Sequence, residues 1–257
     1  MAQTPAPVVA SRSGRVLTVR IQRTARRNAL AAADWAALAA AFADVGDARV
    51  LVLAGVPGAF SAGADIDELG ELLREPARFV AHNALVQGTQ LALERLPIPT
   101  IAAIDGACVG GGLGLALACD FRLATGRARF AITPTRLGLV YSPDDTRRLV
   151  AAVGAARAKA LLFTGRMLDA AEADSFGLLS QRVADDGLDD AVAALAASLA
   201  SMSSTALAGI KRVVAHVAGD PAVDAAAARR AFDDSFHSAD FAEGARAFLA
   251  RRPPQFD

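Results

Sequence analysis

The sequence predicts an α/β protein, in which strands and helices alternate along the chain. Residues 15–21 and 49–54 are apolar runs rich in β-branched side chains and ended by turn residues, as is typical of strands. Residues 29–45 between them are rich in alanine, the residue that most favours helix. Such alternation predicts a layered sheet whose ligands bind at the carboxyl ends of the strands.

The later elements follow the same order. Residues 99–104 are expected to form a short strand that leads into a helix opened by the glycines of 110–114, and residues 121–124 form a further strand. From Pro143 onward, helices with short connections are expected to dominate. No internal repeat or low-complexity linker interrupts this order.

Length, charge and hydropathy limit the classes of function that the chain can have. A chain of 257 residues suits one large domain, or one domain with a small appendage. Lys+Arg and Asp+Glu both number 27, so no net field recruits nucleic acid or an anionic membrane. No apolar run reaches spanning length, and the first residues lack a charged region followed by an apolar one. We expect a cytoplasmic protein with neither nucleic acid nor membrane as a partner.

The cysteines and histidines do not predict a metal site. Cys108 and Cys119 flank the glycine-rich helix and are expected to be small buried residues. His82, His216 and His237 lie too far apart to form a cluster with ligand spacing. The sequence therefore predicts no metal.

The glycines of 110–114 are the most informative feature for function. The first N–H groups of a helix have no internal partner, and the helix dipole favours negative charge there. Glycine lets a ligand approach these groups closely. No register satisfies the dinucleotide pattern G-x-G-x-x-G or A, so a Rossmann site is excluded. The remaining alternative is a tight turn that serves packing alone.

A second glycine loop covers residues 59–66. Asp65 precedes a helical run and is expected to cap it, with Glu68 completing a capping-box-like pair. Capping is preferred over a catalytic role for Asp65. The functional atom of this loop would then be the main-chain N–H of Ala64.

Residues 60–65, Phe-Ser-Ala-Gly-Ala-Asp, followed by Gly106-Ala-Cys-Val-Gly-Gly-Gly112, resemble the crotonase (enoyl-CoA hydratase/isomerase) superfamily. The resemblance implies a ββα spiral core with the acyl-CoA site in residues 1–200 and a C-terminal α-helical trimerisation region in 201–257. It implies that the N–H groups of Ala64 and Gly111 polarise a thioester carbonyl. It also implies a trimer or a dimer of trimers, and no cofactor, since coenzyme A is part of the substrate.

The resemblance further implies residues that bind coenzyme A. Ala62, Asp65, Ile66 and Gly110 belong to the two glycine loops, of which the first lines the adenine pocket. The substrate-binding set is completed by Arg26 and Arg251 as phosphate partners and Phe232 as an aromatic beside the adenine, often across subunits. Considered alone, Arg251 would equally be a solvated helix end, and Phe232 a core residue.

One departure from the family concerns carboxylates. Its hydratases use two glutamates to activate water and to protonate the α-carbon. Here Gly114 and Pro134 occupy those positions, and between Gly106 and Ser142 the only acid is Asp120. Simple hydration should therefore be poor, although the oxyanion hole remains.

Residues 133–148 contain the candidates that could replace the two glutamates. The pattern Thr-Pro-x-x-Leu-Gly-x-x-Tyr resembles the methylmalonyl-CoA decarboxylase branch of the superfamily, whose active-site tyrosine falls at Tyr141. That branch, however, carries histidine where Ala64 stands and an acid where Gly114 stands.

Asp144 and Asp145 are alternative candidates, because some isomerases and dehalogenases of the superfamily place an aspartate base in this loop. The competing interpretation is a helix start, with Ser142 as the cap and acids in the first turn.

Three functions therefore remain open. The first is an acyl-CoA enzyme that stabilises a thioester enolate, by isomerisation through Asp144 or Asp145 or by decarboxylation assisted by Tyr141. The second is a slow or specialised enoyl-CoA hydratase. The third is a non-catalytic acyl-CoA binding protein.

Overall fold

The larger of two sheets forms the centre of the molecule. The structure is a computed structural model that describes residues 6–256. The strands are parallel except for the outermost pair at one edge, which is antiparallel. In spatial order they are β1 (Val8–Ser13), β2 (Val16–Ile21), β3 (Val50–Ala54), β5 (Thr100–Ile104), β7 (Phe121–Thr125) and β10 (Gln181–Val183).

A smaller sheet contains short strands that each follow a long one. Three of its strands are parallel, and the fourth pairs antiparallel at the edge. In spatial order they are β4 (Ala59–Ser61), β6 (Ala107–Val109), β8 (Arg129–Ala131) and β9 (Leu168–Asp169). A long strand, a short strand and then a helix recur three times along the chain, so the backbone winds as a ββα spiral.

Helices cover the strands and contribute most of the remaining core. Trp35, Leu38 and Phe42 of α1 are buried in one cluster with Leu93 and Leu113. The helices of the body are α1 (Ala32–Ala43), α2 (Ile66–Leu72), α3 (Pro76–Glu94), α4 (Gly111–Ala118), α5 (Pro143–Thr164), α6 (Ala170–Ser175) and α7 (Leu188–Ala200), with short turns η1 (Thr24–Arg26) and η2 (Pro134–Leu137). The opposite face of the large sheet packs on α7 through a second buried cluster that includes Val52, Ile101 and Val192.

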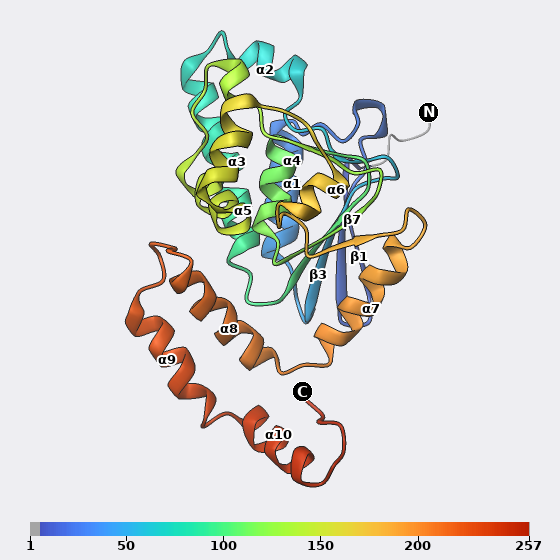
Figure 1. Cartoon of the computed structure of the whole chain (residues 1–257), viewed down its shortest axis with the longest axis vertical. Coiled ribbons are helices and arrows are strands. Elements are labelled where there is room, and N and C mark those ends of the chain that lie inside the picture. Colours follow the sequence, from blue (N-terminus) through green and yellow to red (C-terminus); the bar gives the residue numbers. More distant parts are fainter. Residues whose placement is uncertain (1–5, 257) are drawn as a thin grey trace.

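The last three helices project from the body as an arm. They are α8 (Ser204–Val217), α9 (Ala225–Ser235) and α10 (Ala239–Leu249). Figure 1 shows α9 and α10 at one end of the molecule and α2 at the opposite end. Phe241 is 54% exposed and Phe248 is 82% exposed, so the arm presents apolar side chains that the described chain does not cover.

The predicted α/β class and the four main strands are confirmed. Residues 15–21, 49–54, 99–104 and 121–124 correspond to β2, β3, β5 and β7. The prediction omitted β1, α3 and the short strands. The short strands were missed because two or three residues carry no readable alternation. The predicted helix 29–45 is shorter, since residues 29–31 are held by a bridge between Leu30 and Ala64.

A membrane span requires a helix that is both long enough and apolar enough. No single helix between residues 6 and 256 meets both requirements. Helices α7 and α8 would meet them only as a joined pair, and these two are bent by 104° relative to each other.

Candidate active site

Two glycine loops meet at the amino end of α4. Gly63 has a φ of +93°, a backbone conformation that residues other than glycine rarely adopt. A Cβ placed on Gly63 would lie 2.8 Å from the carbonyl oxygen of Val109 and 3.6 Å from the backbone nitrogen of Gly111. The backbone of the first loop therefore packs directly against the backbone of the second.

Two backbone N–H groups are left free at this junction. Leu30 forms hydrogen bonds with the residues on either side of Ala64. Its N–H donates to the Gly63 oxygen (2.7 Å), and its oxygen accepts from the Asp65 N–H (3.1 Å). The N–H of Ala64 donates to no atom within residues 6–256. Gly111 is the first residue of α4, so its N–H has no partner within the helix. Both donors are available to a ligand oxygen.

The indole of Trp35 explains why residue 111 is glycine. A Cβ on Gly111 would lie 2.9 Å from the Trp35 ring. The ring is only 1% exposed and is held in the core by α1, so it cannot move aside cheaply. Glycine at 111 therefore leaves the backbone there without a side chain that would collide with the ring.

The position of Gly114 is filled by side chains from other helices. A Cβ on Gly114 would overlap Nε2 of Gln90 and would lie 3.2 Å from Oδ1 of Asp145. Gln90 is 1% exposed, and its Nε2 donates weakly to the Gly111 oxygen (3.4 Å). Its buried Oε1 has no hydrogen-bond partner in the described chain. An amide and a carboxylate thus lie where a side chain at 114 would project.

Asp145 is 3% exposed and is held on both of its carboxylate oxygens. Oδ2 accepts from Nε2 of Gln87 (3.0 Å) and from Oγ of Ser142 (2.8 Å). Oδ1 accepts from Nη1 of Arg148 (3.0 Å). A carboxylate oxygen accepts two hydrogen bonds readily, so Oδ1, which is the oxygen near Gly114, keeps one acceptor position unused within the described residues.

The capping interpretation of Ser142 is confirmed as well. Its Oγ accepts from the Asp145 N–H (3.1 Å), and Pro143 is the first residue of α5. The side chain of Asp144 makes no hydrogen bond or ion pair within residues 6–256. The two neighbouring aspartates therefore have different environments, and only Asp145 lies beside Gly114.

The hydroxyl of Tyr141 is buried and has no hydrogen-bond partner among the described residues. Burial, and then the negative charge of Asp145, raise the pKa of Tyr141 well above its ordinary value, although Arg148 opposes this. The phenol therefore stays protonated near neutral pH, and its hydroxyl can donate a hydrogen bond to a ligand.

Comparisons with known proteins agree with this geometry. A family model described as enoyl-CoA hydratase/isomerase matches residues 11–257. A Mycobacterium bovis protein named as a probable enoyl-CoA hydratase is 33% identical, with 97% of each chain covered. The crystal structure of an enoyl-CoA hydratase from Bacillus anthracis superimposes with a TM-score of 0.89 at 30% identity, covering 98% of this chain and 99% of that one.

The chain belongs to the enoyl-CoA hydratase/isomerase family. Its spiral core is the fold that this family's solved structures share, and the crotonase-like architecture expected from the two glycine loops is confirmed. A second solved relative, from Hyphomonas neptunium and described as belonging to the same family, superimposes with a TM-score of 0.93 at 36% identity over 98% of both chains.

Four of the residues expected to bind coenzyme A lie at or beside the two glycine loops. Arg26 is exposed, and its Nη2 lies 2.7 Å from Oδ2 of Asp67. Ile66 is 81% exposed, whereas Ala62 is half-buried. Gly110, with a φ of +53°, would place a Cβ 3.9 Å from the Gly63 Cα and so belongs to the same junction.

Asp65 is a helix cap, but the predicted capping box is wrong. The Asp65 carboxylate accepts from the Asp67 N–H (3.1 Å) and pairs with Arg23 (3.0 Å). Burial alone would raise the pKa of Asp65, but Arg23 and the N–H groups of the following helix outweigh it and lower that pKa. Glu68 accepts from the Ala32 N–H (2.8 Å) and not from Asp65, because the Asp65 N–H is already bonded to Leu30.

Phe232 and Arg251 lie on the arm, away from the glycine loops within one chain. Phe232 of α9 is 51% exposed. Its ring lies edge-on to that of Phe236, with 5.1 Å between the ring centroids. Arg251 follows α10 with a φ of +51° and is exposed. Figure 1 shows α9 and α10 at the end of the molecule opposite to α2, the helix that follows the first loop, so the elements that carry these two residues lie far from that loop within one chain.

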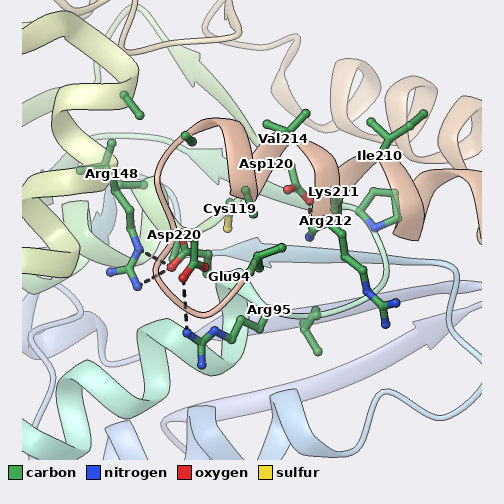
Figure 2. Close-up of a pocket in the computed structure, with 18 of the residues that line it drawn as sticks. Glu94, Arg95, Cys119, Asp120, Arg148, Ile210, Lys211, Arg212, Val214 and Asp220 are labelled. Atoms are coloured by element: carbon green, nitrogen blue, oxygen red, sulfur yellow. Dashed lines mark hydrogen bonds and ion pairs between the residues drawn. The ribbon is translucent and has the colours of Figure 1, made fainter. Parts of the chain in front are cut away.

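A cavity of about 700 Å³ lies between α8 and the body of the protein. Figure 2 shows its charged lining residues, among them Glu94, Arg95, Asp120 and Lys211. Lys211 pairs with Asp120 (2.7 Å), and Arg95 faces Asp220 (3.6 Å). None of the predicted site residues lines this cavity, and these charges already have partners, so the glycine loops remain the candidate active site.

Several residues of the site were not predicted from the sequence. Gln87 and Gln90 are three residues apart on α3, a spacing that places both amides on one helix face. Two polar residues on a face otherwise used for packing were the available signal.

Cys108 and Cys119 are free and buried, as predicted, and no group of three metal-ligating side chains occurs in residues 6–256.

Proposed function

We propose that this protein binds acyl-CoA thioesters and stabilises a thioester enolate with the N–H groups of Ala64 and Gly111. The proposal is supported by one observation above all, the pair of free N–H donors at the junction of two loops. Donors fixed in advance at the place where an oxyanion develops make one of the largest contributions to enzymatic rate enhancement. The acyl part would then extend past Gly114 toward Asp145.

The reaction that we propose is a proton shift, with Asp145 as the base. Its Oδ1 takes a proton from carbon, and the electron pair moves into the thioester to give an enolate held by the two N–H groups. The same carboxyl returns the proton to another carbon, which moves the double bond without loss or gain of atoms. The unused acceptor position of Oδ1 supports this role.

Efficient hydration has less support. It needs one group to activate water and a second to protonate carbon, and neither Gly114 nor Pro134 carries a titratable side chain. The amide of Gln90, which overlaps the space beside Gly114, does not titrate either.

Decarboxylation is the second candidate, favoured by the buried hydroxyl of Tyr141. The bond between the α-carbon and a substrate carboxylate would break, CO₂ would leave, and the electron pair would form the enolate before protonation at carbon. A neutral phenol in a dry environment can orient such a carboxylate without binding it tightly.

A panel of CoA esters tests these proposals. We expect calorimetry to detect binding of a slowly reacting acyl-CoA, and crotonyl-CoA hydration to be about 10²–10⁴-fold slower than in a hydratase with two glutamates. Mass spectrometry of products from enoyl- and malonyl-type esters distinguishes isomerisation from decarboxylation. Binding without turnover would indicate a non-catalytic acyl-CoA protein, and the absence of heat at millimolar ligand would contradict all of these functions.

We further propose that the arm α8–α10 mediates assembly into a trimer or a dimer of trimers in the cytoplasm, where Phe232 and Arg251 approach a neighbouring subunit's site. Exposed phenylalanines on α9 and α10, together with the exposed Ile210, Val214 and Val217 of α8, support this, because a monomer rarely leaves such a patch in water.

Light scattering tests the assembly. We expect a trimer or hexamer at micromolar concentration, and Phe248→Asp should shift it toward monomer because a charge would be buried in the interface. Phe163→Asp is the matched control, since Phe163 is 72% exposed but lies on α5, outside the arm. A monomeric unmodified protein would contradict the proposal.

A further inference from the structure

Glu94 is half-buried and lies at the outer end of a chain of ion pairs that leads to the buried Asp145. Nε of Arg148 donates to Oε2 of Glu94 (2.9 Å), and Nη2 lies 2.7 Å from the same oxygen. The other branch of the guanidinium, Nη1, donates to Oδ1 of Asp145 (3.0 Å). One arginine therefore joins the last residue of α3 to the first turn of α5.

The geometry of Arg148 leaves it little freedom. Its side chain is 2% exposed, and a guanidinium is planar, with donors at fixed angles. Burial works against its charged form, but the hydrogen bond and charge of Glu94, together with the charge of Asp145, outweigh this and raise the pKa of Arg148. The cation is permanent, and its two carboxylate partners fix its plane.

Glu94 is itself held on its second oxygen. Nη2 of Arg147 donates to Oε1 of Glu94 (2.7 Å), so each oxygen of this carboxylate is bound by a different arginine. Glu94, Arg147 and Arg148 line the cavity under α8, and Figure 2 shows Arg148 and Glu94 side by side there. Glu94 thus lies on the side of Arg148 opposite to the one that binds Asp145.

We infer that Glu94 is a positioning residue, which acts through Arg148 to fix the Oδ1 atom of Asp145 toward Gly114. The inference rests on the proposed function of Asp145. Oδ1 is the only carboxylate oxygen of Asp145 with an unused acceptor position. The hydrogen bond from Arg148 to Oδ1 fixes the orientation of the carboxylate, and therefore the direction of that position. Without Glu94, the guanidinium would keep Asp145 as its only anionic partner and could rotate about that single contact.

The test uses the full-length protein and the best substrate of the CoA-ester panel. Glu94→Gln should lower kcat by about 10- to 100-fold while KM changes by less than about threefold, because a small misplacement of a reacting group mainly affects the chemical step. The matched control is Arg147→Gln, which removes the other contact of Glu94 but does not touch Asp145. It should keep kcat within about threefold of the wild-type value.

A double-mutant cycle separates positioning from a merely structural role. Glu94→Gln added to Asp145→Asn should cause no further loss of kcat, because Glu94 acts only through that carboxylate. An additive loss, or an unchanged kcat in Glu94→Gln beside an impaired Asp145→Asn, would overturn the inference and leave the proposed function standing. If Asp145→Asn keeps full turnover, the proposed base is wrong, and the positioning role is wrong with it. Should Glu94→Gln fold poorly, Glu94→Asp provides the same comparison.

Discussion

Gly63→Ala is expected to lower kcat/KM by about 10²–10³-fold, the usual loss when one oxyanion-hole donor is misplaced. An added Cβ would lie 2.8 Å from the Val109 oxygen and 3.6 Å from the Gly111 nitrogen, so it would force the two loops apart. The N–H groups of Ala64 and Gly111 would then lie farther apart than the proposed oxyanion hole requires. Steady-state kinetics with the best substrate would measure the loss.

Gly58→Ala is the matched control for this substitution. Gly58 has a φ of +84°, close to the +93° of Gly63, but a Cβ there would meet nothing within 4 Å. Both variants carry the backbone strain of alanine in a left-handed conformation, which costs about 1–3 kcal/mol. Only Gly63→Ala should lose activity, and equal losses in the two variants would contradict the proposed hole.

Asp145→Asn should lower kcat by about 10²–10⁴-fold if Asp145 is the base, because the amide keeps the shape and cannot accept a proton from carbon. Asp144→Asn changes the neighbouring residue, whose side chain has no hydrogen-bond or ion-pair partner in the described chain, and should have a far smaller effect. Tyr141→Phe should reduce turnover only if the phenol orients the substrate. Melting temperatures must be measured alongside, since Asp145 also binds Arg148.

The three variants together decide what replaces the two glutamates. A loss confined to Asp145→Asn supports the proton shift, and one confined to Tyr141→Phe supports decarboxylation. Wild-type turnover in all three would show that this loop carries no chemistry. Rapid crotonyl-CoA hydration by the unmodified protein would instead mean that hydration does not require acids at 114 and 134.

Sequence reasoning succeeded where the determining residues are adjacent along the chain. The glycine loops, the main strands and the Ser142 cap depend on neighbouring residues, so local patterns predicted them. The capping box failed because a distant residue, Leu30, bonds the Asp65 N–H that Glu68 would need. Local pattern carries no information about such a competitor.

The carboxylate beside Gly114 shows the same limit at the site itself. Asp145 and Gly114 are 31 positions apart, and Gln90 lies on a third helix, so only the folded chain brings the three together. From the sequence, Asp144 and Asp145 were equivalent candidates. Burial and the pairing with Arg148 distinguish them, and both are tertiary properties.

The overlap between Gln90 and the space beside Gly114 also constrains how this enzyme can evolve. A glutamate at 114 would displace the Gln90 amide, whereas a small residue at 90 beside Gly114 would leave a buried void. Each substitution is therefore tolerated best in the presence of the other. A lineage that exchanged this arrangement for a glutamate at 114 one substitution at a time would pass through either the overlap or the void, so the two positions are expected to change together.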